Sequence, residues 1–203
     1  NLDNNQYVWE NERLTGINWT GKNLQGDLNV SGLESLAYLD CSENLLNHLN
    51  VDINTALNYL NCSDNQLNNL DVSKNLALTE LYCFNNQLNN LNVNNNTSLT
   101  DLFCSNNQLN SLDVNNNTSL TRLVCSNNQL STLDVSKNLA LTELSCFNNQ
   151  LSSLDISKNV ALTDLNCRNN QLSTLDVSKN TELEKLTCDH TVTIIGKENT
   201  KLN

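Results

Sequence analysis

Cysteine is the residue type whose spacing in this chain points most directly to chemistry. Eight cysteines recur at a constant interval of 21 residues, at Cys41, Cys62, Cys83, Cys104, Cys125, Cys146, Cys167 and Cys188. In a secreted protein, such a number of cysteines usually forms disulfides, and four cysteines that converge can bind zinc. Which chemistry occurs depends on the elements that carry the cysteines.

A constant period of this length indicates a stacked-repeat protein, in which each repeat contacts only its neighbours. If every cysteine occupies the same position of a parallel strand, neighbouring thiols lie about 4.8 Å apart and point the same way. A disulfide needs its Cβ atoms about 3.8 Å apart and facing each other, and zinc needs four ligands arranged as a tetrahedron. We therefore expect eight buried, unpaired thiols that act as small hydrophobic side chains, with partial disulfide pairing as the main alternative and no metal site.

The repeat reads Leu-x-x-Leu-x-Cys-x-x-Asn-x-Leu-x-x-Leu-x-Val. Its apolar positions fall on one side of each coil, which predicts a single elongated domain over residues 1–203. Residues 36–182 hold seven regular repeats, preceded by an irregular repeat at 14–35 and by an N-terminal cover at 1–13 that carries Tyr7 and Trp9. Residues 183–203 are expected to form a degenerate repeat and a C-terminal cap, with a closing strand at 191–196.

Two rows of asparagine share the period of the cysteines. The first row lies where the chain should leave the strand, at Asn44, Asn65, Asn86, Asn107, Asn128, Asn149 and Asn170. The second row lies at the opposite bend, at Asn54, Asn75, Asn96, Asn117, Asn138, Asn159 and Asn180. An amide that points inward can bond to backbone groups that the coil leaves unpaired, so we expect both rows to be structural.

These repeats carry a resemblance to a known family. The pattern resembles the leucine-rich repeats of bacterial surface proteins, and the 21-residue form with cysteine in a leucine position is similar to the repeat of the internalin J type. The resemblance implies an α/β-type repeat solenoid: a leucine-rich-repeat horseshoe with a parallel concave β-sheet, mostly irregular convex loops and little or no helix. It also implies a role in adhesion or recognition outside the cell.

The strand segment x-Leu-x-Cys-x offers a candidate binding surface. Its leucine and cysteine point inward, so the three variable positions should face outward on the sheet. All the phenylalanines and most of the tyrosines occupy these positions, which predicts an exposed patch. Its centre should be Tyr82, Phe84, Phe103 and Val124, with Tyr38 and Tyr59 adjoining and Phe147 separate. The candidate ligand-binding residues are Tyr38, Tyr59, Tyr82, Phe84, Phe103, Arg122, Val124, Phe147 and Arg168. Alternatively, these aromatic and charged residues only stabilise the sheet.

Other polar residues give weaker signals. A row of carboxylates at Asp113, Asp134 and Asp155 continues to Asp176, and stacked carboxylates can recruit calcium. The glycine-rich spacing of a calcium loop is absent, so bonds from Asp to loop amides explain this row more simply. The two histidines are far apart in sequence, and the chain contains no nucleophile elbow or phosphate-binding loop. We expect no catalytic residues and no cofactor.

Charge and hydropathy restrict the possible partners. A net charge of -11 disfavours nucleic acid and anionic membrane surfaces, and no apolar run approaches the length needed to cross a bilayer. We expect a monomeric, secreted or cell-surface bacterial module that binds a protein, or a glycan, on its concave face without catalysis. The alternative is a structural spacer that projects other domains from the cell surface.

Overall fold

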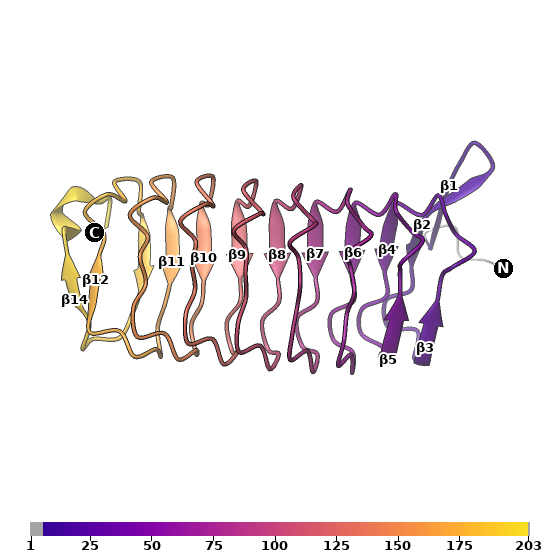
Figure 1. Ribbon diagram of the computed structural model, residues 1–203, viewed down its shortest axis with the longest axis horizontal. Helices are drawn as coiled ribbons and strands as arrows, with labels where there is room; N and C mark the ends of the chain where they lie inside the picture. Colours follow the sequence, from indigo (N-terminus) through magenta and orange to yellow (C-terminus); the bar gives the residue numbers. More distant parts are fainter. Residues whose placement is uncertain (1–5, 203) are drawn as a thin grey trace.

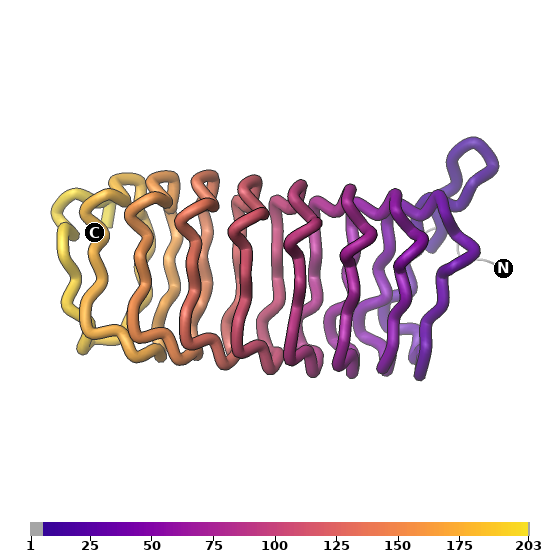
Figure 2. The backbone as a smooth tube through the Cα atoms, in the orientation of Figure 1, coloured from indigo at the N-terminus to yellow at the C-terminus, as the bar shows by residue number. Residues whose placement is uncertain are grey.

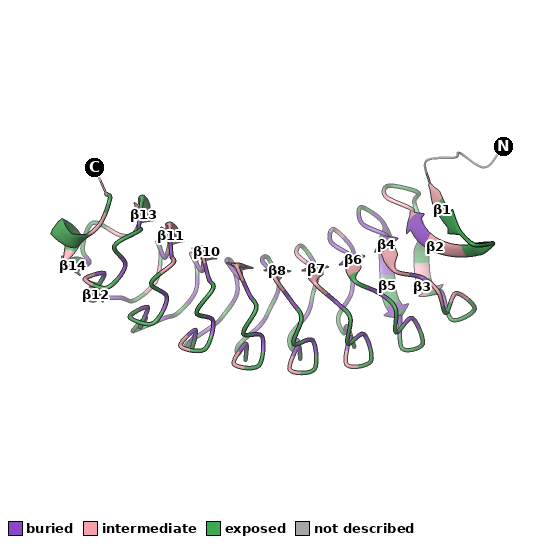
Figure 3. Cartoon of the chain, turned by 90° about the horizontal axis from the view of Figure 1, so that it is seen from above, coloured by how far each residue is buried: buried purple, intermediate pink, exposed green. Residues whose placement is uncertain are grey.

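The computed structural model is a row of stacked coils whose sequence order runs along the long axis of the body (Figure 1). It describes residues 6–202. Each coil carries a short strand on one long side and a loop on the other, and the backbone repeats this path from coil to coil (Figure 2). Viewed from above, the coils form a shallow arc with the strands along its inner side (Figure 3).

The principal sheet contains ten strands, of which the first two are antiparallel and the others are added in parallel. In spatial order they are β1 (Tyr7–Glu10), β2 (Arg13–Asn18), β4 (Tyr38–Asp40), β6 (Tyr59–Asn61), β7 (Glu80–Tyr82), β8 (Asp101–Phe103), β9 (Arg122–Val124), β10 (Glu143–Ser145), β11 (Asp164–Asn166) and β13 (Lys185–Thr187). From β4 to β13 each strand pairs with the next in constant register, as Leu81 does with Leu102. The predicted parallel concave sheet is therefore confirmed.

The opposite side of the coils is mostly irregular. Two small parallel sheets lie there at the two ends of the body, β3 (Gln25–Asn29) with β5 (Leu45–Asn50), and β12 (Thr174–Asp176) with β14 (Thr193–Ile195). Within residues 6–202 the only helix is the short 3-10 segment η1 (Lys197–Asn199), so the expectation of little or no helix is confirmed. No helix in this part of the chain has the length and apolar character to cross a membrane.

Every central coil contributes the same inward side chains to one continuous core. In a central coil, Leu99, Leu102, Cys104, Leu109 and Val114 are completely buried. The equivalent residues of the coils on both sides are buried in the same way. Because each coil covers its neighbours, no coil has a core of its own, and stability depends on stacking.

The chain leaves each strand through a residue with left-handed backbone geometry. These residues have φ between 53° and 56°, at Glu43, Asp64, Asn85, Asn106, Asn127, Asn148 and Asn169. Asparagine and aspartate adopt this conformation more readily than most residues, which explains the first asparagine of the recurring Asn-Asn-Gln sequence. The side chains also form an exposed ladder, in which the Asn106 amide donates to Oδ1 of Asn85 at 2.6 Å.

At the N-terminal end, β1 and β2 form a hairpin with a register shift between Val8 and Trp9. Tyr7 packs against the core edge-to-face with Trp19, whose Nε1 donates to the Tyr7 hydroxyl at 3.2 Å. Trp9 was expected to help cover this end, but the bulge turns it outward and its side chain is 63% exposed. The boundaries proposed for the end segments remain predictions, and residues 1–5 and 203 lie outside the described part.

The expected closing strand is present but shorter than residues 191–196. Strand β14 pairs with β12 on the loop side of the coils, and Val192 and Ile194 pack against the core while Ile195 is exposed. Gly196 follows with φ 77°, and a Cβ there would lie 2.5 Å from the backbone of Ser178. Only glycine fits this close approach.

Candidate functional site

The concave face consists of outward side chains in columns across the principal sheet. Because the parallel strands keep constant register, the first residue of each strand lies beside the first residue of the next. The last residues of the strands form a second column in the same way. Aromatic residues in both columns are thus brought together although they are far apart in sequence.

Four rings form a continuous aromatic row, defined here as Tyr38, Tyr59, Tyr82 and Phe103. Tyr38 and Tyr59 stack with ring centroids 4.4 Å apart and an interplanar angle of 12°. The row then crosses diagonally to the second column, with centroids 5.5 Å apart from Tyr59 to Tyr82 and 5.0 Å apart from Tyr82 to Phe103. These separations are those of favourable ring pairs. Each ring remains partly exposed.

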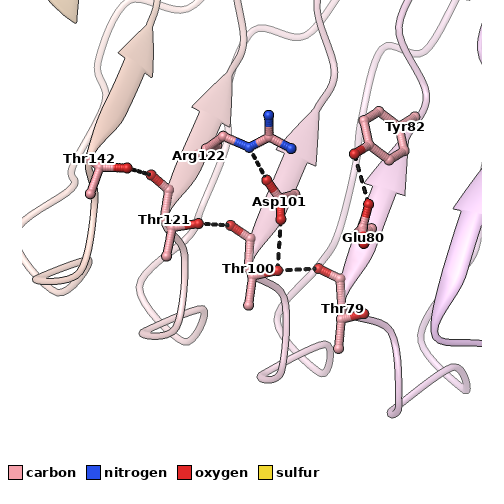
Figure 4. Close-up of polar contacts among 8 residues, drawn as sticks. All are labelled: Thr79, Glu80, Tyr82, Thr100, Asp101, Thr121, Arg122 and Thr142. Carbon is pink, nitrogen blue, oxygen red and sulfur yellow. Dashed lines mark hydrogen bonds and ion pairs between the residues drawn. The ribbon is translucent and has the colours of Figure 1, made fainter. Parts of the chain in front are cut away.

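Arg122 closes one end of this row. Its guanidinium carbon lies 5.1 Å from the centroid of the Phe103 ring, and its Nε donates to Oδ1 of Asp101 (Figure 4). Asp101 is only 9% exposed, and its other oxygen accepts a hydrogen bond from Thr100 at 2.8 Å. The hydrogen bond to Asp101 raises the pKa of Arg122. The arginine thus combines a cation–π contact with a partly buried ion pair.

The tyrosines lie in an electronegative environment. The Tyr82 hydroxyl donates to Oε2 of Glu80 at 2.8 Å (Figure 4). Desolvation, reinforced by Glu80, raises the pKa of Tyr82 to about 12. Desolvation also raises the pKa of Tyr38 and Tyr59, and the Asp40 charge adds to both shifts. The rings are therefore uncharged at neutral pH and lie next to carboxylates.

The other end of the aromatic row borders a shallow hollow of about 260 Å³. It is lined by Gln6, Val8, Gly16, Ile17, Asn18 and Tyr38. Gly16 pairs with Tyr38 across the sheet, and Val8 takes the space that a Cβ on Gly16 would need. Gly16 itself therefore adds no side chain to the hollow beside Tyr38.

The remaining predicted site residues are more dispersed. Phe84 and Phe147 lie in the third variable column beside serines or Arg168, and neither makes a ring contact in residues 6–202. The expected centre therefore changes: Tyr38 and Tyr59 belong to it, and Phe84 does not. Val124 adjoins Phe103 in register, and Arg168 is exposed. Whether any of these residues binds a ligand remains a prediction.

The expectation that all three columns face solvent is wrong for several residues. Ser42, Ser63, Ser105 and Ser126 of the third column are buried. The strands end before this column, at the left-handed turn, so the alternation of a strand no longer sets the side-chain direction. Asp40 and Asp101 are also buried, because hydrogen-bonding neighbours cover their carboxylates.

Behind the sheet, the asparagines of the first row bridge adjacent coils. The Asn107 amide nitrogen donates to the carbonyl oxygens of Cys83, Cys104 and Ser105, and its Oδ1 accepts from the Leu88 N–H. The second row bridges coils at the opposite bend through its amide nitrogen, as Asn117 does to Val93 and Asn96. The exposed side-chain ladder at the left-handed turns, which includes Asn85 and Asn106, is a third row that the sequence analysis did not identify. The signal available in the sequence was the first asparagine of each Asn-Asn-Gln segment.

All eight cysteines are free, and the first seven are buried in a straight ladder behind the sheet. Desolvation raises the thiol pKa of these buried cysteines, to about 12 for Cys62 and Cys104. Cys188 departs from the expectation of eight buried thiols, because it lies in the last coil and is only half-buried. No further coil stacks on it within the described residues.

Comparison with solved structures agrees with this geometry. The chain superimposes on the functional domain of InlJ from Listeria monocytogenes, which includes a cysteine ladder, with 36% sequence identity and a TM-score of 0.76. The match covers 86% of this chain and 44% of that one. The chain is a leucine-rich-repeat protein with a cysteine ladder. No family model matches this leucine-rich-repeat chain, and no curated protein matches it.

Two further structures place the leucine-rich-repeat fold in a wider context. A leucine-rich-repeat protein of Leptospira interrogans is 29% identical, with a TM-score of 0.74, over 83% of this chain and 46% of that one. The ectodomain of the plant membrane receptor kinase GASSHO1/SCHENGEN3 from Arabidopsis thaliana, solved in complex with CASPARIAN STRIP INTEGRITY FACTOR 2, is 25% identical. Its TM-score is 0.80 over 89% of this chain and 24% of that one. This leucine-rich-repeat chain thus spans less than half the length of these structures.

The carboxylate row of the leucine-rich-repeat loops binds its own backbone. Oδ1 of Asp134 accepts from the Ser136 N–H at 2.9 Å, and Asp155 makes the same bond to Ser157. These hydrogen bonds lower the pKa of both carboxyl groups. Residues 6–202 contain no cluster of three or more acidic, histidine or cysteine side chains arranged to hold a metal ion.

The cysteine ladder predicts a graded reactivity of the thiols. In the native protein, a thiol reagent such as DTNB should modify only Cys188, because the other seven thiols are shielded and protonated. After denaturation without reductant, all eight should react. Cys188→Ser should abolish the reaction of the native protein. The ladder of buried free thiols would be contradicted if two or more thiols of this variant reacted in the native state, or if fewer than seven reacted after denaturation.

Proposed function

We propose that this domain is a noncatalytic recognition module that binds a protein partner on its concave face. The observation that carries this proposal is the aromatic row with its Arg122 cap, which lies on an open sheet face. Tyrosine, phenylalanine and arginine on a rigid surface supply much of the binding energy at protein interfaces. The plant receptor ectodomain, solved in complex with CASPARIAN STRIP INTEGRITY FACTOR 2, supports a protein-interaction role. The similarity to InlJ, whose repeat type the sequence analysis matched to bacterial surface proteins, favours a secreted or cell-surface location on a bacterium.

The composition of the chain strengthens the proposal. Only nine aromatic side chains occur in 203 residues, and four of them form this one row on the concave face. Strands hold these rings in fixed register, so a partner would bind a preformed surface and little conformational entropy would be lost.

The same stacking is also what a purely structural role requires. Cross-strand ring pairs stabilise a sheet by roughly 0.2–1 kcal/mol each, and the stacked Tyr38 and Tyr59 rings fit that description. In that case the domain would act as a spacer. A glycan is the other competing ligand, because sugar rings also stack on tyrosine.

A display selection distinguishes these roles. A random 12-residue peptide library and a glycan array would be screened with the wild type and with the double variant Tyr82→Ser/Phe103→Ala. We expect selected peptides to lose at least about tenfold in affinity for this variant, because two of the four rings of the row are removed. The matched control is Leu139→Ala/Val160→Ala, which removes two exposed apolar side chains outside the concave face and should not change binding.

Folding of each variant would be checked by circular dichroism and urea unfolding. Equal peptide binding by the wild type and by a folded Tyr82→Ser/Phe103→Ala variant would overturn the proposed site. If that variant unfolds while the control does not, the aromatic row stabilises the sheet and the spacer role gains support. Selection of glycans alone would replace the protein partner with a carbohydrate.

A further inference from the structure

The concave face has an uneven distribution of charge. In the half formed by β4, β6, β7 and β8, the three outward columns contain Asp40, Glu80 and Asp101 but no lysine or arginine. In the half that follows, three basic residues (Arg122, Arg168 and Lys185) face three acidic ones (Glu143, Asp164 and Asp189). The half that carries the aromatic row is therefore the acidic half.

Both ends of the aromatic row have a buried carboxylate, but within the described part of the chain only the Phe103 end has a basic side chain beside it. At the Phe103 end, a cation lies over the ring face and pairs with a buried carboxylate, because Arg122 bonds to Asp101. At the Tyr38 end there is again a buried carboxylate, Asp40, which is 8% exposed. Among residues 6–202 Asp40 has no basic partner, and its hydrogen bonds come from Ser42 and Asn61.

The surroundings of Tyr38 leave room for a cation. The hollow described above borders Tyr38, and Gly16, which pairs with Tyr38, adds no side chain to it. Val8, which is exposed, supplies apolar lining that suits the aliphatic stem of a long basic side chain. Burial raises the pKa of Tyr38, and the negative charge of Asp40 adds to this shift, so Asp40 lies close enough to act on the Tyr38 hydroxyl.

We propose that the hollow beside Tyr38 is the subsite for a cationic side chain of the protein partner, bound over the Tyr38 ring and near Asp40. The contact between Arg122 and Phe103 shows the same chemistry within this chain. Arginine fits better than lysine, because a planar guanidinium stacks on a ring and donates several hydrogen bonds at once. This inference rests on the proposed function, and it specifies the partner as a protein segment with an exposed basic residue.

The test uses a defined probe, the peptide acetyl-Gly-Gly-Arg-Gly-Gly-amide, and its citrulline analogue. Citrulline keeps the planar shape of the arginine head group but carries no charge. In an NMR titration of labelled protein, the arginine peptide should shift the Gly16 amide and the Tyr38 ring signals and bind at least about fivefold more tightly than the citrulline peptide. Equal binding of the two peptides would overturn the proposal whatever the variants do.

Two matched variants separate a specific subsite from attraction to an acidic protein. Asp40→Asn removes the negative charge that lies two residues after Tyr38 on β4 and preserves the shape of the side chain, whereas Asp134→Asn removes one on the loop side. We expect Asp40→Asn to weaken the arginine peptide at least about fivefold and Asp134→Asn to leave it within about twofold. Tyr38→Leu serves as a second variant if Asp40→Asn does not fold. Equal weakening by the concave and loop variants would overturn the proposal.

The library-selected peptides distinguish failure of this subsite from failure of the proposed function. Peptides that depend on Tyr82 and Phe103, contain basic residues and weaken with Asp40→Asn would support both. Peptides that depend on Tyr82 and Phe103 but neither contain basic residues nor respond to Asp40→Asn would overturn the subsite and leave the concave interface intact. If the selected peptides bound the wild type and the Tyr82→Ser/Phe103→Ala variant with equal affinity, the proposed function would be overturned.

Discussion

Raising the pH from about 8 to about 10 should unfold the solenoid, even with reductant present. Seven buried thiols have a pKa raised by desolvation, to about 12 for Cys62 and Cys104, against an ordinary value of 9.0. Above about pH 9 the unfolded chain holds fewer protons than the folded chain. Stability that is fully present below this pH is therefore lost as the pH rises toward the folded-state values.

The expected loss is large because the seven thiols act together. Within this window each thiol lowers the folding equilibrium constant by about tenfold per pH unit. At pH 10 this amounts to roughly 1 kcal/mol per thiol, which for seven thiols is comparable to the whole stability of a typical domain, about 5–15 kcal/mol. Urea unfolding followed by circular dichroism at several pH values would measure the dependence.

The double variant Cys104→Ala/Cys125→Ala provides the control. It contains five of the seven buried thiols, so the fall of its unfolding free energy with pH should be shallower by about two-sevenths. Tyr82, with a pKa raised to about 12, adds its own effect only toward the upper end of the range. Unchanged stability between pH 8 and 10, or an identical slope in the double variant, would show that the thiols do not control alkaline unfolding.

The periodic part of the fold was predictable from the sequence because each repeat has apolar and asparagine residues at the same positions. Leucine and cysteine at fixed positions defined the inward face, and seven copies fixed the register that Leu81 and Leu102 show. The ends were less predictable because they lack this redundancy. The direction of Trp9 depends on a bulge in the hairpin, and the exposure of Cys188 depends on how much of the last coil the C-terminal segment covers.

The candidate site was predictable as a face but not in its detail. Constant register placed Tyr82 beside Phe103, as the two-residue period of strands requires. The diagonal contact from Tyr59 to Tyr82 depends on rotamers that no sequence pattern specifies. Asp40 and Asp101 each accept a hydrogen bond from the next coil, from Asn61 and Arg122 respectively, and the hollow at Tyr38 adjoins Gly16, which pairs with it. These tertiary details are the ones on which the cation subsite rests.

Replacing Asn107 with alanine should lower the free energy of unfolding by about 4 kcal/mol or more. Its side chain satisfies three carbonyl oxygens and one N–H, which belong to its own coil and the preceding one. Alanine would leave the Leu88 N–H without a partner, at a cost of about 1–3 kcal/mol. The carbonyl oxygens of Cys83, Cys104 and Ser105 would each keep one other donor, so each lost bond there adds about 0.5–1.5 kcal/mol. Urea unfolding at neutral pH would measure the loss.

Two other asparagines of the same region provide graded controls. Asn117→Ala should cost less than Asn107→Ala, because the Asn117 amide serves two carbonyl oxygens and its Oδ1 has no hydrogen-bond partner in residues 6–202. Asn110→Ala, on an exposed side chain, should change the unfolding free energy by no more than about 0.5 kcal/mol. The expected order follows the number of backbone groups that each amide satisfies. If Asn107→Ala and Asn110→Ala were equally stable, the bridging asparagine row would not hold adjacent coils together, and stacking would depend on the leucine and cysteine core alone.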